Sequence, residues 1–422
     1  MQLPSLPPEL VDQIIENLKD DPMTLKCCAS VCRGWLSPSR FRIFRRITLE
    51  PREPSRPFEF LRRKRKSALQ SLVDAIKASP EIASYIREVE IVEGIGAQEW
   101  IGNEPLLFFF LALLKHVTRF KLRHSAVMPI SWNSLSTEFK IELLRFLASS
   151  LLCEINLGML SFVDAKAFRL LLRCPSHLRI LHFDHIQITE SSNDPSETPL
   201  ADRVIFHPTR AHLETLVLGA RTSPRVIGCL LHPESAIDIT SLRNLSISVS
   251  NNFEEFARLL RSAFNLKSLE ILLMSDIDLG SYQQLPLPGR FDLSHNLFIT
   301  TLSVRIDVIQ RQDDPLPWLN TLLSTFTAPN KLRNIYVVYS LYLPSPYMDR
   351  SVNTSVFSNW QEIDTTLTGP TFDALEEVRL EFSLENPIGF GVAPRFLEEV
   401  DLQSPALRAS NRLVVEAFDT SR

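Results

Sequence analysis

A short pattern of apolar positions repeats along most of this 422-residue chain. Each copy has one aliphatic or aromatic residue, two others, an apolar residue, one other and a second apolar residue. Because alternate residues of an extended chain point to the same face, each copy predicts a β-strand with one buried face. An opening copy starts at Phe44. The ten copies that follow begin at Ile86, Val117, Leu152, Leu178, Leu213, Leu242, Leu266, Ile299, Leu332 and Leu375.

Most copies are preceded by a segment whose apolar residues have helical spacing, such as 139–147, 253–264 and 318–326. Alternating helices and strands predict parallel strands joined by crossover helices. The pattern resembles leucine-rich repeats, although the copies are longer and more unevenly spaced, and most lack the usual asparagine. The resemblance implies an α/β solenoid with a curved parallel sheet over residues 51–402, followed by a C-terminal tail, 403–422. A compact α/β domain with a parallel sheet is the alternative.

The first 50 residues instead show the apolar spacing of three short helices. Pro7 and Pro8 mark the start of the first helix, Asp21 caps the second ahead of Pro22, and Pro38 marks the third. Three helices of this length bury little apolar surface among themselves. Their apolar faces therefore predict a partner.

The pattern Leu6-Pro7-x-Glu9-Leu10, with its continuation to Trp35, resembles the F-box of mushroom-type fungal F-box proteins. The resemblance covers residues 1–50 and implies docking on a Skp-type adaptor within a cullin–RING ubiquitin ligase. An ordinary three-helix cap is the alternative. The residues that the resemblance assigns to adaptor contact are Leu6, Pro7, Pro8, Leu10, Ile14, Leu18, Leu25, Cys28, Val31, Cys32 and Trp35.

Strand residues between the apolar positions must point to the other, open face of the sheet. In the first copies these residues alternate in charge, as in Glu88, Arg119 and Glu154. This alternation favours ion pairs between neighbouring strands over a recognition site. On the middle strands these residues are small, which leaves space on the open face. On the later strands they include Tyr and Arg, the residue types that are enriched at binding hot spots. The predicted target-binding residues are Gly219, Ser246, Ser248, Arg305, Tyr336 and Arg379.

Three segments interrupt the repeats and predict loops, namely 187–201, 282–290 and 341–370. Insertions in repeat proteins often carry binding, so the last segment is an alternative target site, although loops without a role fit equally well. The basic run from Arg62 to Lys66 has helical flanks. A solvated helix face is therefore favoured over a nuclear import signal or a patch for an acidic partner.

The composition gives little sign of catalytic chemistry. The net charge of −4 argues against bulk attraction to nucleic acid or an anionic membrane, and the longest apolar run, 106–114, is too short to span a bilayer. No CxxC pair, P-loop or GxSxG motif occurs.

On a strand, His182 and Asp184 share one face while His185 points away, which does not fit a zinc triad. We expect neither metal nor cofactor, no signal peptide, and a cytoplasmic or nuclear location.

These features predict a substrate-recognition subunit of a Skp–cullin–F-box ubiquitin ligase that has no active site of its own. Residues 1–50 would bind the adaptor, and the repeat region would bind a protein target. The alternative is an adaptor-bound scaffold or binding protein that does not promote degradation. A free-standing solenoid with a coincidental N-terminus is a third possibility.

Overall fold

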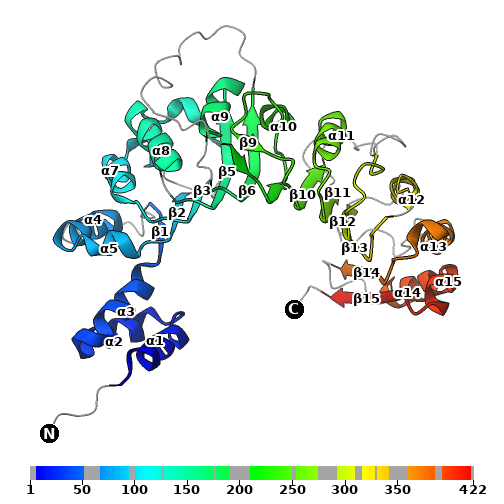
Figure 1. Cartoon of the computed structure of the whole chain (residues 1–422), viewed down its shortest axis with the longest axis horizontal. Helices are drawn as coiled ribbons and strands as arrows, with labels where there is room; N and C mark the ends of the chain where they lie inside the picture. The colour runs from blue at the N-terminus through cyan, green and yellow to red at the C-terminus, as the bar shows by residue number, and fades with distance from the viewer. Residues whose placement is uncertain are drawn as a thin grey trace, which may run out of the picture. The chain divides into compact units, whose positions relative to one another are not determined.

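Two compact units make up the chain in the computed structural model, Met1–Ala211 with Glu234–Ile237, and His212–Pro233 with Asp238–Arg422. The division falls inside the region that the sequence predicts as one repeat domain. Figure 1 labels the helices and strands. The structure describes residues 6–51, 67–94, 100–124, 128–149, 151–173, 177–189, 210–249, 253–273, 292–308, 316–327, 330–341, 360–384 and 392–419.

The N-terminal part of the first unit has three helices, α1 (Pro8–Asn17), α2 (Pro22–Val31) and α3 (Arg33–Phe44). The Asp21 carboxylate caps α2 and accepts hydrogen bonds from the backbone N–H groups of Met23 and Thr24. Hydrogen bonds from Thr24 hold the pKa of this carboxyl below its usual range. These starts agree with the proline and aspartate signals.

The third helix begins earlier than Pro38 predicts. The carbonyl of Cys32 accepts hydrogen bonds from the N–H groups of Trp35 and Leu36, so α3 is already formed one turn before the proline. Pro38 then lies inside the helix, where its missing N–H removes a single backbone hydrogen bond. The prediction of a start at Pro38 was wrong for this reason.

Five strands of the first unit pair side by side, all parallel, in the order β1-β2-β3-β5-β6. The helices lie on one face of these strands (Figure 1). The strands are β1 (Arg46–Leu49), β2 (Glu88–Glu93), β3 (Arg119–His124), β5 (Glu154–Phe162) and β6 (Ile180–Ile188), with the short β4 (Ile130–Ser131) beside β5. The helices are α4 (Ala68–Ala78), α5 (Glu81–Tyr85), α6 (Trp100–Asn103), α7 (Pro105–Leu113), α8 (Thr137–Ser149) and α9 (Ala165–Leu171), with a 3₁₀ turn at Trp132–Ser134.

Seven strands of the second unit are likewise parallel, in the order β8-β10-β11-β12-β13-β14-β15. They are β8 (Thr215–Leu218), β10 (Asn244–Val249), β11 (Ser268–Leu273), β12 (Thr301–Val308), β13 (Asn334–Leu341), β14 (Glu377–Leu384) and β15 (Leu413–Asp419). The helices are α10 (Arg225–Leu230), α11 (Phe253–Ser262), α12 (Leu316–Ser324), α13 (Trp360–Leu367), α14 (Val392–Gln403) and α15 (Pro405–Ala409), with a 3₁₀ turn at Pro370–Phe372. The short strands β7 (Ala211–His212) and β9 (Ile237–Asp238) form a separate two-stranded sheet.

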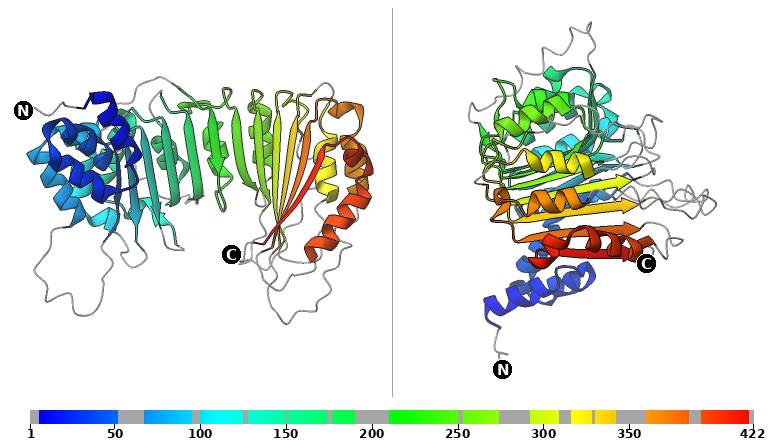
Figure 2. Two further views of the ribbon diagram at one scale, coloured as in Figure 1. Left: turned by 90° about the horizontal axis from the view of Figure 1, so that it is seen from below. Right: turned by 90° about the vertical axis from the view of Figure 1, so that its right-hand side faces the viewer.

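All ten predicted copies fall on parallel strands, as Figure 2 shows for the strands of each unit. Each of their thirty apolar positions is buried, and the most exposed, Leu218, keeps only 3% of its surface accessible. Because a parallel sheet covered by crossover helices buries this face completely, the buried triplets form the core. The α/β architecture and the parallel strands are therefore confirmed.

Two predictions about the C-terminal region were wrong. The predicted tail, 403–422, contains α15 and β15, and β15 continues the sheet by pairing Leu413 with Val378 of β14. The predicted interruption at 341–370 contains α13, whose residues Trp360, Ile363 and Leu367 are buried. The basic run 62–66 and the predicted loop 282–290 lie outside the described residues, as does most of the loop 187–201.

Candidate interaction surfaces

The three N-terminal helices share a small apolar cluster of their own. Val11, Ile15, Leu25 and Cys28 form its buried centre, and Leu18, Trp35 and Ile43 pack against it. Leu25 and Cys28 are among the residues that the F-box resemblance assigns to adaptor contact. Their side chains are enclosed within the cluster, so Leu25 and Cys28 support the helices and do not face outward. Leu18 and Trp35 are partly buried and support the cluster.

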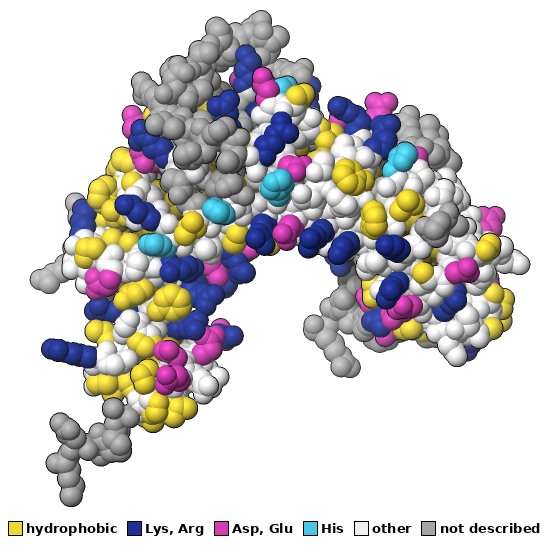
Figure 3. Space-filling model, viewed as in Figure 1, with side chains coloured by type: hydrophobic (Ala, Val, Ile, Leu, Met, Phe, Trp, Pro, Cys, Tyr) yellow, Lys and Arg dark blue, Asp and Glu magenta, His cyan; other side chains and the backbone are white. Residues whose placement is uncertain are grey.

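A second apolar set on the same helices faces outward. Leu10 and Ile14 lie one turn apart on α1, whereas the buried Val11 and Ile15 occupy its inner face. The predicted contacts Pro7, Pro8 and Cys32 are also exposed, and Figure 3 shows hydrophobic side chains gathered over these helices. The large side chains of this outer set keep much of their surface accessible: Leu6 48%, Leu10 45%, Ile14 37%, Met23 69% and Val31 66%.

Helix α3 is fixed to the first repeat by an aromatic and ionic junction. The Phe41 ring meets Tyr85 of α5 edge-on, with 6.2 Å between centroids, and Arg87 lies over the same ring at 5.9 Å. Arg40 pairs with Glu81 of α5 at 3.4 Å. These contacts attach α3 to the first repeat. A protein bound to the N-terminal helices would therefore be held next to the first strands of this unit.

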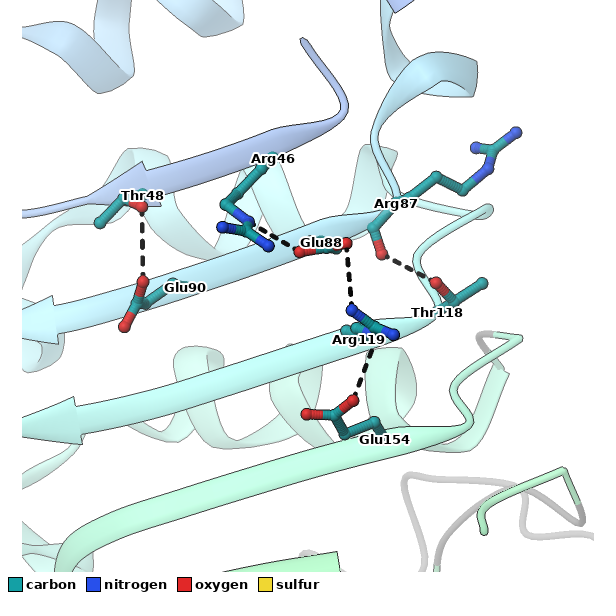
Figure 4. A network of polar contacts seen from close by, with 8 residues as sticks. All are labelled: Arg46, Thr48, Arg87, Glu88, Glu90, Thr118, Arg119 and Glu154. Carbon is teal, nitrogen blue, oxygen red and sulfur yellow. Dashed lines mark hydrogen bonds and ion pairs between the residues drawn. The ribbon is translucent and has the colours of Figure 1, made fainter. Parts of the chain in front are cut away.

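The open face of the first unit carries a ladder of ion pairs (Figure 4). Glu88 of β2 contacts Arg46 of β1 at 2.7 Å and Arg119 of β3 at 3.4 Å. Arg119 also contacts Glu154 of β5 at 3.1 Å. The strand register places these side chains directly opposite one another. The predicted charge ladder is confirmed, and its charges are largely neutralised within the sheet.

In the second unit, the register divides the predicted target residues between two rows. Ser246, Tyr336 and Arg379 lie in one row, together with Glu270 and Ser303. Ser248 and Arg305 lie in the next row, together with Leu272, Val338 and Glu381. Gly219 directly follows β8.

The surroundings of these residues differ. The Ser246 hydroxyl donates to Glu270 Oε2 at 2.7 Å, and Ser248 is buried. The Ser248 side chain is therefore not open to a partner, unlike that of an exposed residue. Arg379 Nε lies 2.9 Å from Glu377 Oε1, Tyr336 is half-buried, and Arg305 is exposed. The open face thus offers one exposed guanidinium and one phenol ring within neighbouring rows.

The His182 to His185 segment does not form a metal site. His182 and Asp184 lie on the open face of β6, whereas His185 has a φ of 52° and its ring nitrogen contacts Gln187 Nε2 at 3.1 Å. Burial lowers the pKa of His182, which favours its neutral form. Among the described residues, no group of three His, Cys, Asp or Glu side chains could hold a metal ion.

No protein-family model and no curated protein matches this chain. Over the ranges that the structure describes, no helix has the length and apolar character needed to cross a bilayer. The surfaces themselves therefore provide the basis for a functional proposal.

Proposed function

We propose that this protein is a non-catalytic substrate-recognition subunit of a Skp–cullin–F-box ubiquitin ligase, working in the cytoplasm or nucleus. The N-terminal helices bind a Skp-type adaptor, and the repeats, a solenoid of the leucine-rich-repeat type, bind a protein target. The outward apolar set on α1 and α2 carries the proposal. Its sequence pattern resembles the F-box, and its side chains are open to a partner.

The exposed apolar surface of this set is large enough to form the centre of an interface. Complete burial of a leucine or valine side chain contributes about 1.5–3 kcal/mol, and on average about half of the surface of these outward side chains is still accessible. Leu6, Leu10, Ile14 and Val31 together therefore offer about 3–6 kcal/mol. This is a substantial part of the roughly 8–12 kcal/mol of a micromolar to nanomolar complex.

The test is binding of a purified Skp-type adaptor to the full chain carrying Leu10→Asp and Ile14→Asp. Both side chains are partly exposed, so the variant should keep its melting temperature while adaptor binding falls by at least about a hundredfold, because an interface would bury unpaired carboxylates. Leu151→Asp is the matched control, since Leu151 is a 52% exposed leucine of the same unit outside these helices. Unchanged adaptor binding by the double variant would refute the assignment.

Target binding on the second unit is tested separately. The triple variant Arg305→Glu, Tyr336→Ala and Arg379→Glu should keep adaptor binding and lose the target protein. A reconstituted ligase distinguishes the receptor from the scaffold, because only a receptor supports ubiquitin transfer to the captured protein by raising its effective concentration. Retention of the target by the triple variant would place recognition elsewhere in the chain.

A further inference from the structure

Three large apolar side chains lie exposed in the segments that directly precede β11 and β12 in the second unit. Phe264 follows α11 and is 47% exposed, and Leu297 and Phe298, in the turn before β12, are 42% and 46% exposed. We call Phe264, Leu297 and Phe298 the aromatic patch. Monomeric proteins rarely leave neighbouring large side chains in water unless a ligand or partner covers them.

Buried hydrogen bonds hold the two chain segments of the patch together. The Asn296 side chain is fully buried, and its Nδ2 donates to the carbonyls of Leu260 and Ala263 at 3.0 Å each. The Thr300 N–H donates to the Lys267 carbonyl at 2.8 Å. The turn before β12 is thereby fixed against the end of α11, so the patch is a built surface rather than a loose loop.

Basic side chains border the patch. Lys331 Nζ lies 4.7 Å from the centroid of the Phe298 ring. Lys267 and Arg243 follow each other in consecutive repeats, linked by the hydrogen bond from the Lys267 N–H to the Arg243 carbonyl at 2.8 Å. Both are exposed. Arg243 in turn follows Glu214, whose carbonyl accepts the Arg243 N–H at 2.9 Å, so Lys267 and Lys331 are the basic groups that an acidic partner would meet at the patch.

From this geometry we propose that the aromatic patch, with Lys267 and Lys331, is a docking surface for an acidic segment of a partner protein that carries large apolar side chains. The apolar groups of the segment cover the two rings and Leu297, and its carboxylates face the lysines. An anionic membrane would meet the same chemistry, but the whole chain carries a net charge of −4, which opposes adsorption to such a surface. Figure 3 shows hydrophobic side chains over α11 and α12, with basic, acidic and histidine side chains around them.

The test is selection from a displayed peptide library on the full chain, followed by anisotropy titration of the selected peptides. We expect enriched peptides to be acidic and to contain at least two large apolar residues. Their affinity should fall at least about tenfold in Phe264→Ser with Leu297→Ser, as for loss of interface anchors. Lys267→Glu with Lys331→Glu should lower it similarly, and 0.5 M salt should weaken wild-type binding through screening.

Phe109→Ser is the matched control, because Phe109 is a 39% exposed ring in the first unit with Lys77 Nζ 4.9 Å from its centroid. This variant should bind the selected peptides as the wild type does. The proposal would be overturned if the enriched peptides were basic or uncharged, if their binding survived both double variants, or if no peptides were enriched. So would preferential binding to anionic vesicles. The test uses no adaptor, so its outcome is independent of the proposed ligase function.

Discussion

Removal of a single buried carboxylate should release the last strand of the sheet. Asp364 of α13 is 5% exposed, and its two oxygens accept the N–H groups of Ala406 at 3.1 Å and Leu407 at 2.8 Å. Through these bonds it caps α15, the helix that leads directly into β15. Asp364→Ala should therefore act mainly on residues 405–419.

The expected loss follows from the two bonds. Removing a helix cap costs about 0.5–2 kcal/mol, and leaving the buried Leu407 N–H without a partner costs about 1–3 kcal/mol. The two effects overlap, so we expect about 2–3 kcal/mol in total. Asp364→Asn keeps one acceptor oxygen and should lose about half as much.

Hydrogen exchange followed by mass spectrometry measures this effect locally. If α15 and β15 open as one cooperative segment, exchange over 405–419 should accelerate roughly a hundredfold in Asp364→Ala, with little change over β2 and β3. Asp373→Ala is the control, because Asp373 is an exposed aspartate of the same unit. Equal exchange over 405–419 in the two variants would show that the cap does not hold the segment.

Three further predictions concern the sheet. Because the pKa of His182 is lowered in the folded protein, stability should be constant above the unfolded-state pKa of about 6.5 and fall as the pH decreases below it; His182→Gln should flatten this slope in thermal melts. Glu88→Gln removes the ion pairs with Arg46 and Arg119 and should lower the free energy of unfolding by about 1 kcal/mol at low salt. The difference from the wild type should be smaller at 1 M salt because salt screens the ion pairs. A difference that does not change with salt would contradict the ion-pair ladder. Leu245→Asp places an unpaired charge in the core and should prevent folding, as judged by circular dichroism, whereas a native spectrum would show that its site is not closed.

The strands could be predicted from the sequence because the apolar triplet of every copy packs on the same, buried face of the sheet. Each triplet points inward, so its burial depends only on local alternation and on the presence of a covering helix. β15 was missed since its segment carries alternating apolar residues without the preceding apolar position, and its place in the sheet depends on pairing with β14. Within β6, the positive φ of His185 shifts the alternation, so Ile186 and Ile188 become buried beyond the predicted triplet.

The division of the N-terminal helices into inner and outer residues could not be predicted with the same certainty. Leu10 and Val11 are neighbours of similar hydrophobicity, yet Val11 lies in the cluster and Leu10 is exposed. The choice depends on how α1 sits against α2 and α3, which periodicity alone does not determine when a helix is apolar on two sides. Leu25 and Cys28 entered the adaptor-contact set through the F-box resemblance, which does not separate contact residues from those that hold the three helices together.

The open faces of the two units use polar residues for different purposes, and this difference directs the search for a partner. In the first unit, Glu88 and Arg119 satisfy each other and their neighbours, so a ligand would have to break ion pairs in order to bind. In the second unit, the Ser246 hydroxyl donates to Glu270 and Arg379 pairs with Glu377, whereas Arg305 is exposed in the row next to that of the half-buried Tyr336. An added carboxylate could therefore pair with Arg305 without displacing an internal bond. A partner with an acidic group and an aromatic or apolar neighbour fits this face better than a basic partner does.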